Sequence, residues 1–281
     1  MRKIKSERQF LWRFILGTLL IPFNFILYLY KKRELKHLFD PLVNLIKFIF
    51  ESRFSIFIII INIIIFVWSL FQPEELINSL IMYPSDLYNL RLNTLITSGF
   101  LHANLAHLFG NMLGIFIFGR VVERKLGIIK TAIIYFSALL VSSFFYCMIN
   151  LLFAGNNIGA LGASGALMGL VSAAIFLDPF YFTYQLGFPL PIMVVGWLTF
   201  YADIAGIINP VNDGISHISH IGGFLSIILI AYLIGRDEAK EIKRGLVINV
   251  LSLIFFLVLY YLILPSLDFS IITTNSSQLI G

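Results

Sequence analysis

Seven long apolar segments, separated by short polar ones, organise the sequence. They fall at residues 54–72, 105–121, 130–153, 164–178, 189–208, 216–235 and 246–264. Each is bounded by Pro, Gly or charged residues, and the stretches 56–71 and 246–264 contain no charge at all. A helix needs roughly 20 apolar residues to cross a bilayer, and in lipid the backbone amides must be satisfied within their own segment. The pattern therefore predicts seven membrane-spanning helices.

A further apolar stretch, residues 14–30, is predicted to lie in the membrane interface. Pro22 and Asn24 interrupt this stretch, and Arg13 stands at its edge. Basic residues flank it on both sides, so a crossing would carry the charges that precede it to the opposite face of the membrane. An eighth span is the alternative that stays open. Residues 1–53 as a whole are expected to form an N-terminal cytoplasmic or interfacial segment.

Composition supports a membrane protein. Hydrophobic residues fill 59% of the 281 positions and charged residues only 12%. A soluble domain has about 45–50% apolar residues and about 25% charged residues. The net charge of +5 could suggest nucleic-acid binding, but Lys and Arg in a membrane protein more often mark cytoplasmic loops, so no nucleic-acid partner is expected. The single cysteine, Cys147, excludes an internal disulfide, a CxxC redox pair and a multi-cysteine zinc site.

The positions of Lys and Arg predict the orientation. Basic residues cluster before the first span, after the second and after the sixth, which fall on one side of a seven-helix arrangement. The stretches 150–163, 207–215 and 265–281 have no Lys or Arg, and the first outer loop has only Arg91. The positive-inside rule places the N-terminus in the cytoplasm and the C-terminus outside. A cell membrane is expected, because the N-terminus does not resemble an Arg- and Ser-rich transit leader.

Polar residues within the predicted spans are the candidate functional residues, because such groups are costly in lipid. His107 and Asn111 are four residues apart and share one helix face. Their ring N–H and side-chain amide could together donate hydrogen bonds to a developing oxyanion. An interhelical polar pair that only fixes packing is the alternative, and these two residues alone favour it.

A second set of residues points to an activated serine. His220 is followed by Gly222 and Gly223, and Ser164 opens a span with small residues at positions 165, 169 and 173. If these small surfaces pack together, Ser164 and His220 can come within hydrogen-bonding reach. A helix N-cap is the commoner role for such a serine and stays open here. The Ser164 backbone N–H, in the first helical turn, would be a further oxyanion donor.

Three motifs together resemble the rhomboid family. Thr97-Ser98-Gly99-Phe100-Leu101-His102, continued by His107 and Asn111, resembles the family's second-helix signature. Gly162-Ala163-Ser164-Gly165 is similar to its GxSG nucleophile motif, and His217-x2-His220-Ile221-Gly222-Gly223 to its sixth-helix motif. GxSG alone is a weak signal, whereas the three motifs in order on the second, fourth and sixth spans are specific. The resemblance covers about residues 54–235.

The resemblance implies an all-α, polytopic membrane helix bundle, with a six-helix catalytic core at 54–235 and an extra C-terminal helix and outer tail at 236–281. It implies an intramembrane serine endopeptidase that cleaves single-span membrane proteins. Ser164 would be the nucleophile and His220 its base, with Asn111, His107 and the Ser164 N–H as oxyanion donors. No metal or cofactor is implied. The other matched residues would line the site or pack its helices, namely His102, Gly162, Gly165, Met168, His217, Gly222 and Gly223.

Three positions depart from the family pattern. Leu90-Arg91 stands where members often have Trp-Arg, which puts the anchoring of the first loop in question. Met168 replaces a Tyr that packs on the base in some members, although a thioether can also pack on an imidazole. Ile227 replaces a small residue of the sixth span and shortens its close-packed stripe. None of the three removes a catalytic group.

Two other functions fit parts of the pattern. A catalytically inactive relative that binds membrane-protein clients would lack the serine or the histidine, and both are present. A metal site on the histidines would need further ligands, but the chain has no HExxH motif. Asp178 and Asp203 lie near helix ends, away from the histidines in sequence. The protease is therefore the favoured function.

Overall fold

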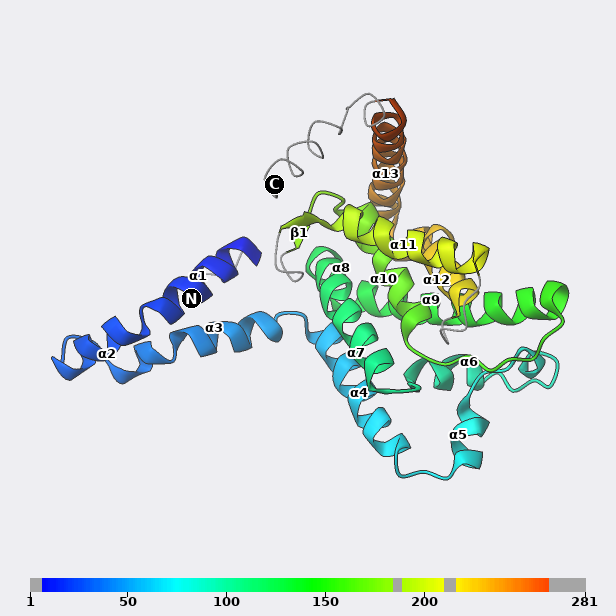
Figure 1. Ribbon diagram of the computed structural model, residues 1–281, viewed down its shortest axis with the longest axis horizontal. Coiled ribbons are helices and arrows are strands. Elements are labelled where there is room, and N and C mark those ends of the chain that lie inside the picture. Colours follow the sequence, from blue (N-terminus) through cyan, green and yellow to red (C-terminus); the bar gives the residue numbers. More distant parts are fainter. Residues whose placement is uncertain (1–6, 184–188, 210–215, 263–281) are drawn as a thin grey trace, which may run out of the picture.

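The computed structural model describes residues 7–183, 189–209 and 216–262, and these residues form a helical bundle (Figure 1). The α-helices are α1 (Glu7–Leu19), α2 (Ile21–Leu29), α3 (Asp40–Ile49), α4 (Arg53–Ser69), α5 (Glu74–Leu80), α6 (Thr94–Thr97), α7 (Leu105–Gly114), α8 (Arg120–Leu126), α9 (Ile128–Ile149), α10 (Ser164–Leu177), α11 (Ile192–Ile208), α12 (His217–Ile234) and α13 (Arg236–Leu262). Short 3-10 helices are η1 (Leu35–Leu38), η2 (Pro84–Asp86) and η3 (Ser98–Phe100), and π-helical turns are η4 (Ile115–Gly119) and η5 (Asn150–Ala154).

Among the described residues, four helices are long and apolar enough to cross a membrane by length and composition, namely 105–126, 128–153, 217–234 and 236–261. The count rises to six if two bent pairs, α1–α2 and α3–α4, are each one span. The α10 and α11 helices are apolar but shorter. Each of the seven apolar segments therefore contains a helix, and a polytopic all-α bundle is confirmed.

Two boundaries and one local element differ from the sequence-based prediction. The α13 helix starts at Arg236 instead of residue 246, because its charged first turns are also helical. The second span continues to Leu126 through the π-helical turn η4. A two-residue antiparallel ribbon, β1 (Phe182–Thr183) with β2 (Leu190–Pro191), joins α10 to α11 and was not predicted. The predicted outer tail, 265–281, lies outside the described residues.

The α10 helix is the centre of the bundle (Figure 1). Twelve of its fourteen residues are buried, and it contacts α9, α11, α12 and α13. The added helix α13 packs closely on it, because a Cβ at Gly245 would lie 1.7 Å from the Phe176 carbonyl oxygen. Asn249 strengthens this contact by donating to the Ile175 carbonyl and accepting from the Trp197 indole. The first residue of α10 is therefore held by a well-supported helix.

Charged contacts at one end of the bundle join the three basic regions of the sequence. The Glu123 carboxylate accepts hydrogen bonds from the backbone N–H groups of Phe54 and Ser55, which open α4. A carboxylate satisfies such unpaired amides and suits the helix dipole. Further ion pairs link the same regions, namely Arg120–Glu51, Arg124–Glu51, Lys125–Glu241 and Lys130–Glu238. The basic regions before α4, after α7 and after α12 therefore lie at a common end.

The N-terminal helices α1 to α3 extend to one side of the bundle (Figure 1). The α1 and α2 helices bend by 49° at a break near Pro22. The chain then returns, so that Phe10 of α1 stacks on Phe48 of α3 with ring centroids 3.8 Å apart. The helix break in the stretch 14–30 therefore falls beside Pro22, which interrupts the apolar sequence. A broken span and an interfacial helix pair both fit this shape.

The loop between α4 and α7 is built around a buried carboxylate. Asp86 accepts hydrogen bonds from the Tyr83 backbone N–H and the Thr94 hydroxyl, and its other oxygen lies 3.4 Å from an Arg91 guanidinium nitrogen. Arg91 also donates to the Ser79 carbonyl. Arg91 is thus anchored without the Trp that often precedes it in the family pattern.

Candidate active site

Ser164 is the first residue of α10, at the end of a loop that is pinned on both sides. In that loop Ala160 forms a β-bridge with Met82, and the Gly162 N–H donates to the Ser98 carbonyl at 2.9 Å. Ala163 is the N-cap residue and makes no side-chain capping bond. The alternative role of Ser164 as an N-cap is therefore wrong, and its hydroxyl is not used to start the helix.

Gly162 leaves room for two polar side chains of α7. Its φ of +120° favours glycine, and a Cβ there would lie 2.7 Å from His107 Nε2 and 3.5 Å from Asn111 Nδ2. Asn104 caps α7 by accepting from the His107 backbone N–H at 2.8 Å, which fixes the start of the helix. His107 and Asn111 therefore both reach the turn that precedes Ser164.

The Asn111 side-chain nitrogen is buried and has no hydrogen-bond partner among the described residues. A buried donor without a partner is rare and carries a desolvation cost of about 1–3 kcal/mol. A packing residue would be expected to pair this donor. The unpaired amide next to Gly162 is instead typical of a donor kept ready for a ligand or a reacting oxygen.

Glycines allow α10 and α12 to touch through their backbones. A Cβ at Gly223 would lie 2.0 Å from the Gly165 carbonyl oxygen, and a Cβ at Gly165 would lie 3.2 Å from the Ser219 hydroxyl oxygen. Gly222 faces the Phe145 side chain of α9 instead. Since Ser164 precedes Gly165 and His220 follows Ser219, both come from the same contact between α10 and α12.

His220 is held by the carboxylate of Asp203, which lies 17 residues earlier in the sequence. Asp203 of α11 is only 4% exposed, and its Oδ1 lies 2.6 Å from His220 Nδ1 and 2.9 Å from His217 Nδ1. Asp203 is distant from the histidines in sequence but not in space, because the fold brings α11 against the start of α12. An acidic residue within an otherwise apolar segment was the signal that could have identified it.

Gly206, one turn after Asp203, makes room for the second histidine. A Cβ at Gly206 would lie 2.2 Å from His217 Nε2, so only glycine leaves space for this ring. Asp203, His217 and His220 each offer a ligand atom within 4.8 Å of the others. Within the described part of the chain they are therefore a group that could hold a metal ion.

The remaining predicted residues lie around these groups. His102 is 7% exposed, and its ring centroid lies 5.1 Å from that of His107 in an edge-on arrangement. Met168 is 2% exposed, and its Cβ lies 3.2 Å from the position of a Cβ at Gly223. Met168 therefore packs at the contact between α10 and α12, one turn along from Ser164.

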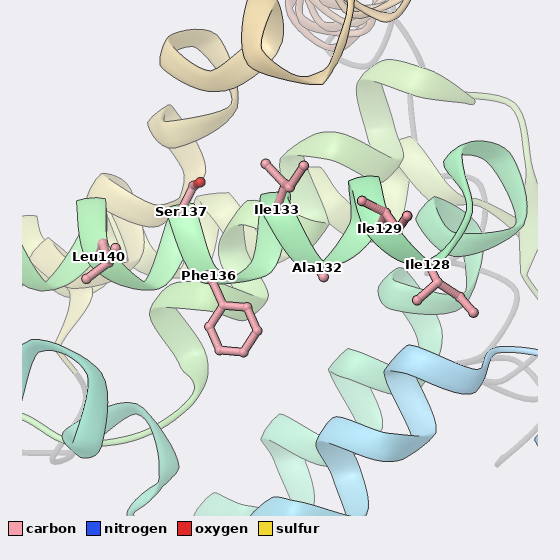
Figure 2. Close-up of a pocket in the computed structure, with 7 residues that line it drawn as sticks. All are labelled: Ile128, Ile129, Ala132, Ile133, Phe136, Ser137 and Leu140. Carbon is pink, nitrogen blue, oxygen red and sulfur yellow. The ribbon is translucent and has the colours of Figure 1, made fainter.

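A separate apolar groove runs along α9, between Ile128 and Leu140 (Figure 2). The apolar side chains that line it include Ile129, which is 76% exposed. None of the candidate catalytic residues lines this groove. It is typical of a helix surface that faces lipid rather than of a reaction site.

The residues around Ser164 can together carry out acyl transfer. A serine hydroxyl at a helix N-terminus, an imidazole oriented through one nitrogen, and donors from a second helix supply a nucleophile, a base and an oxyanion site. The donors would come from α7, the nucleophile from α10 and the base from α12.

Comparison with known proteins gives a consistent result. A family model described as the Rhomboid domain matches residues 89–237, which is more than half of the chain. The chain is 30% identical over 181 residues to RHOMBOID-like protein 12, mitochondrial, of Arabidopsis thaliana, covering 59% of this chain and 54% of that protein. It is 26% identical over 188 residues to Rhomboid protease GlpG of Photorhabdus laumondii, covering 66% of this chain and 63% of that protein.

The matches thus span less than two thirds of either relative's length. All three motif regions nevertheless fall within the matched domain, and the surrounding helices are apolar. The expected resemblance is confirmed: the chain belongs to the rhomboid family and is a multi-pass membrane protein.

Proposed function

We propose that the protein is an intramembrane serine endopeptidase with Ser164 as nucleophile and His220 as general base. The observation that carries the proposal is the buried amide nitrogen of Asn111, which has no hydrogen-bond partner among the described residues and lies beside the glycine turn before Ser164. One of the relatives described above is named a rhomboid protease. Family members can be inactive, so the proposal depends on the residues of this chain.

The reaction starts at the Ser164 hydroxyl. Its Oγ attacks the scissile carbonyl carbon, while its proton moves to His220 Nε2. This nitrogen is the one available, because His220 Nδ1 is engaged by Asp203. The ring then gives the proton to the leaving amine as the C–N bond breaks, and a water molecule hydrolyses the acyl-enzyme by the same route in a second cycle.

The negative charge of the tetrahedral intermediate would be held by three donors. These are the Ser164 backbone N–H, the Asn111 amide and the His107 ring N–H. The Ser164 N–H belongs to the first turn of a 14-residue helix, where amides lack intrahelical partners and the dipole favours an anion. Removing one such donor typically lowers turnover by about 10²–10³-fold.

Substrates of the proposed enzyme are single-span membrane proteins, cut near or within the membrane at small residues in a segment that unwinds easily. This class follows from the resemblance to the family. An extended backbone is needed at the site, because a helical segment hides its carbonyls in hydrogen bonds. The lipid bilayer is the medium in which enzyme and substrate meet.

We infer a topology of seven spans, taking α4, α7–α8, α9, α10, α11, α12 and α13 in turn. Residues 54–235 form the catalytic core in this proposal, 1–53 an N-terminal segment and 236–281 an added helix with its tail. The ion pairs that join the basic regions at one end support a common cytoplasmic side for them. The N-terminus is then cytoplasmic, the C-terminus outside, and the host membrane the cell membrane.

The deciding experiment is labelling of the purified, detergent-solubilised protein with a fluorophosphonate probe, followed by cleavage of a reconstituted single-span substrate. Ser164→Ala is expected to abolish both signals, and His220→Ala is expected to abolish cleavage and to leave only slow residual labelling. Ser172→Ala is the matched control, since Ser172 lies on the same helix, buried, with its hydroxyl bonded to the Gly169 carbonyl. If folded wild-type protein is neither labelled nor active, the chain is an inactive relative that binds membrane-protein clients.

A further inference from the structure

The Asp203 carboxylate is placed to act on the proposed base rather than on the substrate. It lies on α11, within an otherwise apolar segment, and its side chain is only 6% exposed. A carboxylate in such surroundings is costly unless it is paired. Its pairing is with His220 and His217, since one oxygen, Oδ1, contacts Nδ1 of both rings.

The distances favour hydrogen bonds over metal coordination. Ligand atoms around a tetrahedral zinc ion, each about 2.0–2.1 Å from the metal, lie about 3.3 Å from one another. The Asp203 oxygen is 2.6 Å from one ring nitrogen and 2.9 Å from the other. Both values are hydrogen-bond lengths, and the shorter one is typical of a bond to a charged acceptor.

With Asp203 ionised, these two contacts favour one tautomer of each ring. An ionised carboxylate has no proton to donate, so each contact is a hydrogen bond only if the ring nitrogen carries the proton. His220 is then protonated at Nδ1 in its neutral form, and the lone pair lies on Nε2. That is the tautomer a general base for Ser164 requires.

We propose that Asp203 is a positioning residue that turns the Ser164–His220 pair into a three-residue catalytic arrangement. The inference rests on the proposed function. Asp203 fixes the tautomer and orientation of His220, and its negative charge lies beside the ring when Nε2 takes the serine proton. Asp203 itself gains no proton, because that proton passes from His220 to the leaving amine.

His217 and Gly206 have a supporting part in this arrangement. His217 donates to the same oxygen that accepts from His220, so the carboxylate is held from a second side. Gly206 leaves the space that the His217 ring occupies. His217 therefore restrains Asp203 without a role of its own in the proton transfer.

The test compares Asp203→Asn, Asp203→Glu and His217→Ala by kcat and KM for a single-span substrate and by the rate of fluorophosphonate labelling. Asp203→Asn keeps size but can present an amide N–H to Nδ1, which selects the wrong tautomer. It is expected to lower kcat by about 10²–10⁴-fold with KM unchanged. Asp203→Glu retains the carboxylate and should recover part of the loss, and His217→Ala should cause a smaller loss.

Asp178→Asn is the matched control, because it is the same exchange at the opposite end of α10, and it should leave kcat unchanged. A double-mutant cycle separates positioning from general damage. In a His220→Ala background, Asp203→Asn should lower the residual labelling no further, since both changes act through one imidazole.

Three results would overturn the inference while leaving the proposed function intact. The first is wild-type turnover in Asp203→Asn, and the second is no recovery of kcat in a folded Asp203→Glu protein. The third is a loss of labelling on adding Asp203→Asn to His220→Ala that is as large as the loss caused by Asp203→Asn alone. Failure of wild-type protein to label at all would instead remove the proposed function itself. Thermal unfolding in detergent identifies any variant whose loss reflects misfolding.

Discussion

The Gly223→Ala exchange tests whether the backbone contact between α10 and α12 sets the active geometry. A Cβ at this position would lie 2.0 Å from the Gly165 carbonyl oxygen and 2.9 Å from the attached carbon. Carbon and oxygen normally approach no closer than about 3.3 Å, so the deficit is about 1.3 Å. Both obstructing atoms are backbone, and relief requires the two helices to separate.

The expected magnitudes follow from that separation. Overpacking of a tight contact typically destabilises by about 1–3 kcal/mol. A displacement near 1 Å between a nucleophile and its base can lower the rate about 10²-fold. Gly223→Ala should therefore be folded but less stable, with labelling of Ser164 slowed by about two orders of magnitude.

Two further glycines give a graded comparison. A Cβ at Gly222 would lie 2.8 Å from the Phe145 Cβ of α9, a smaller overlap than the one at Gly223, so Gly222→Ala should have an intermediate effect. A Cβ at Gly110 would meet nothing within 4 Å, although this residue precedes the oxyanion candidate Asn111 on α7. Gly110→Ala should leave the labelling rate unchanged.

The assay is the second-order rate of fluorophosphonate labelling, measured with the unfolding temperature of the same detergent-solubilised samples. If Gly223→Ala labels and unfolds like wild type, the contact between the helices does not control the reaction, and the argument from the glycines is refuted. A loss of equal size in Gly110→Ala would likewise show that the effect is not specific to this contact.

Three other predictions follow from single side chains. Asn111→Ala should lower kcat by about 10–1,000-fold with little change in KM, because it removes one oxyanion donor; an unchanged kcat would make Asn111 a packing residue. Glu123→Ala should destabilise the protein by about 1–3 kcal/mol in detergent unfolding, since it leaves the Phe54 and Ser55 amides unpaired; an unchanged unfolding temperature would contradict this capping role. Burial raises the pKa of the Asp178 carboxyl, so the folded state binds its proton more readily than the unfolded chain, and stability is lost as pH rises through the raised value. Asp178→Asn should therefore raise the unfolding temperature at neutral pH but not at a pH below 3.8, the ordinary pKa of this carboxyl. A rise in unfolding temperature that is independent of pH would argue against this cause.

The order of the helices and the chemistry of three of them could be predicted from the sequence. Apolar runs long enough to cross a bilayer must form helices, because lipid offers no partner for backbone amides. The charge rule groups the basic loops, and the ion pairs Lys125–Glu241 and Lys130–Glu238 do join two of them. Ser164 and His220 were identified because local motifs carry them.

The surroundings of those residues depended on contacts between segments that are far apart in sequence. Asp203 lies 17 residues before His220, on another helix, and only the packing of α11 against α12 shows which way its carboxylate points. Hydropathy likewise could not predict that the second apolar helix ends at Leu126 and that α13 starts at Arg236. Charged residues continue both helices beyond their apolar segments.

The sequence by itself determined that this is a multi-pass helical membrane protein of the rhomboid family and which residues are its candidate nucleophile and base. Hydropathy, charge and motifs are local properties and can be read without coordinates. The tertiary structure decided that Gly223 meets the Gly165 carbonyl, that the Asn111 amide nitrogen has no partner among the described residues, and that Asp203 contacts His220. These depend on the rotation and separation of packed helices, which are set by many weak contacts at once.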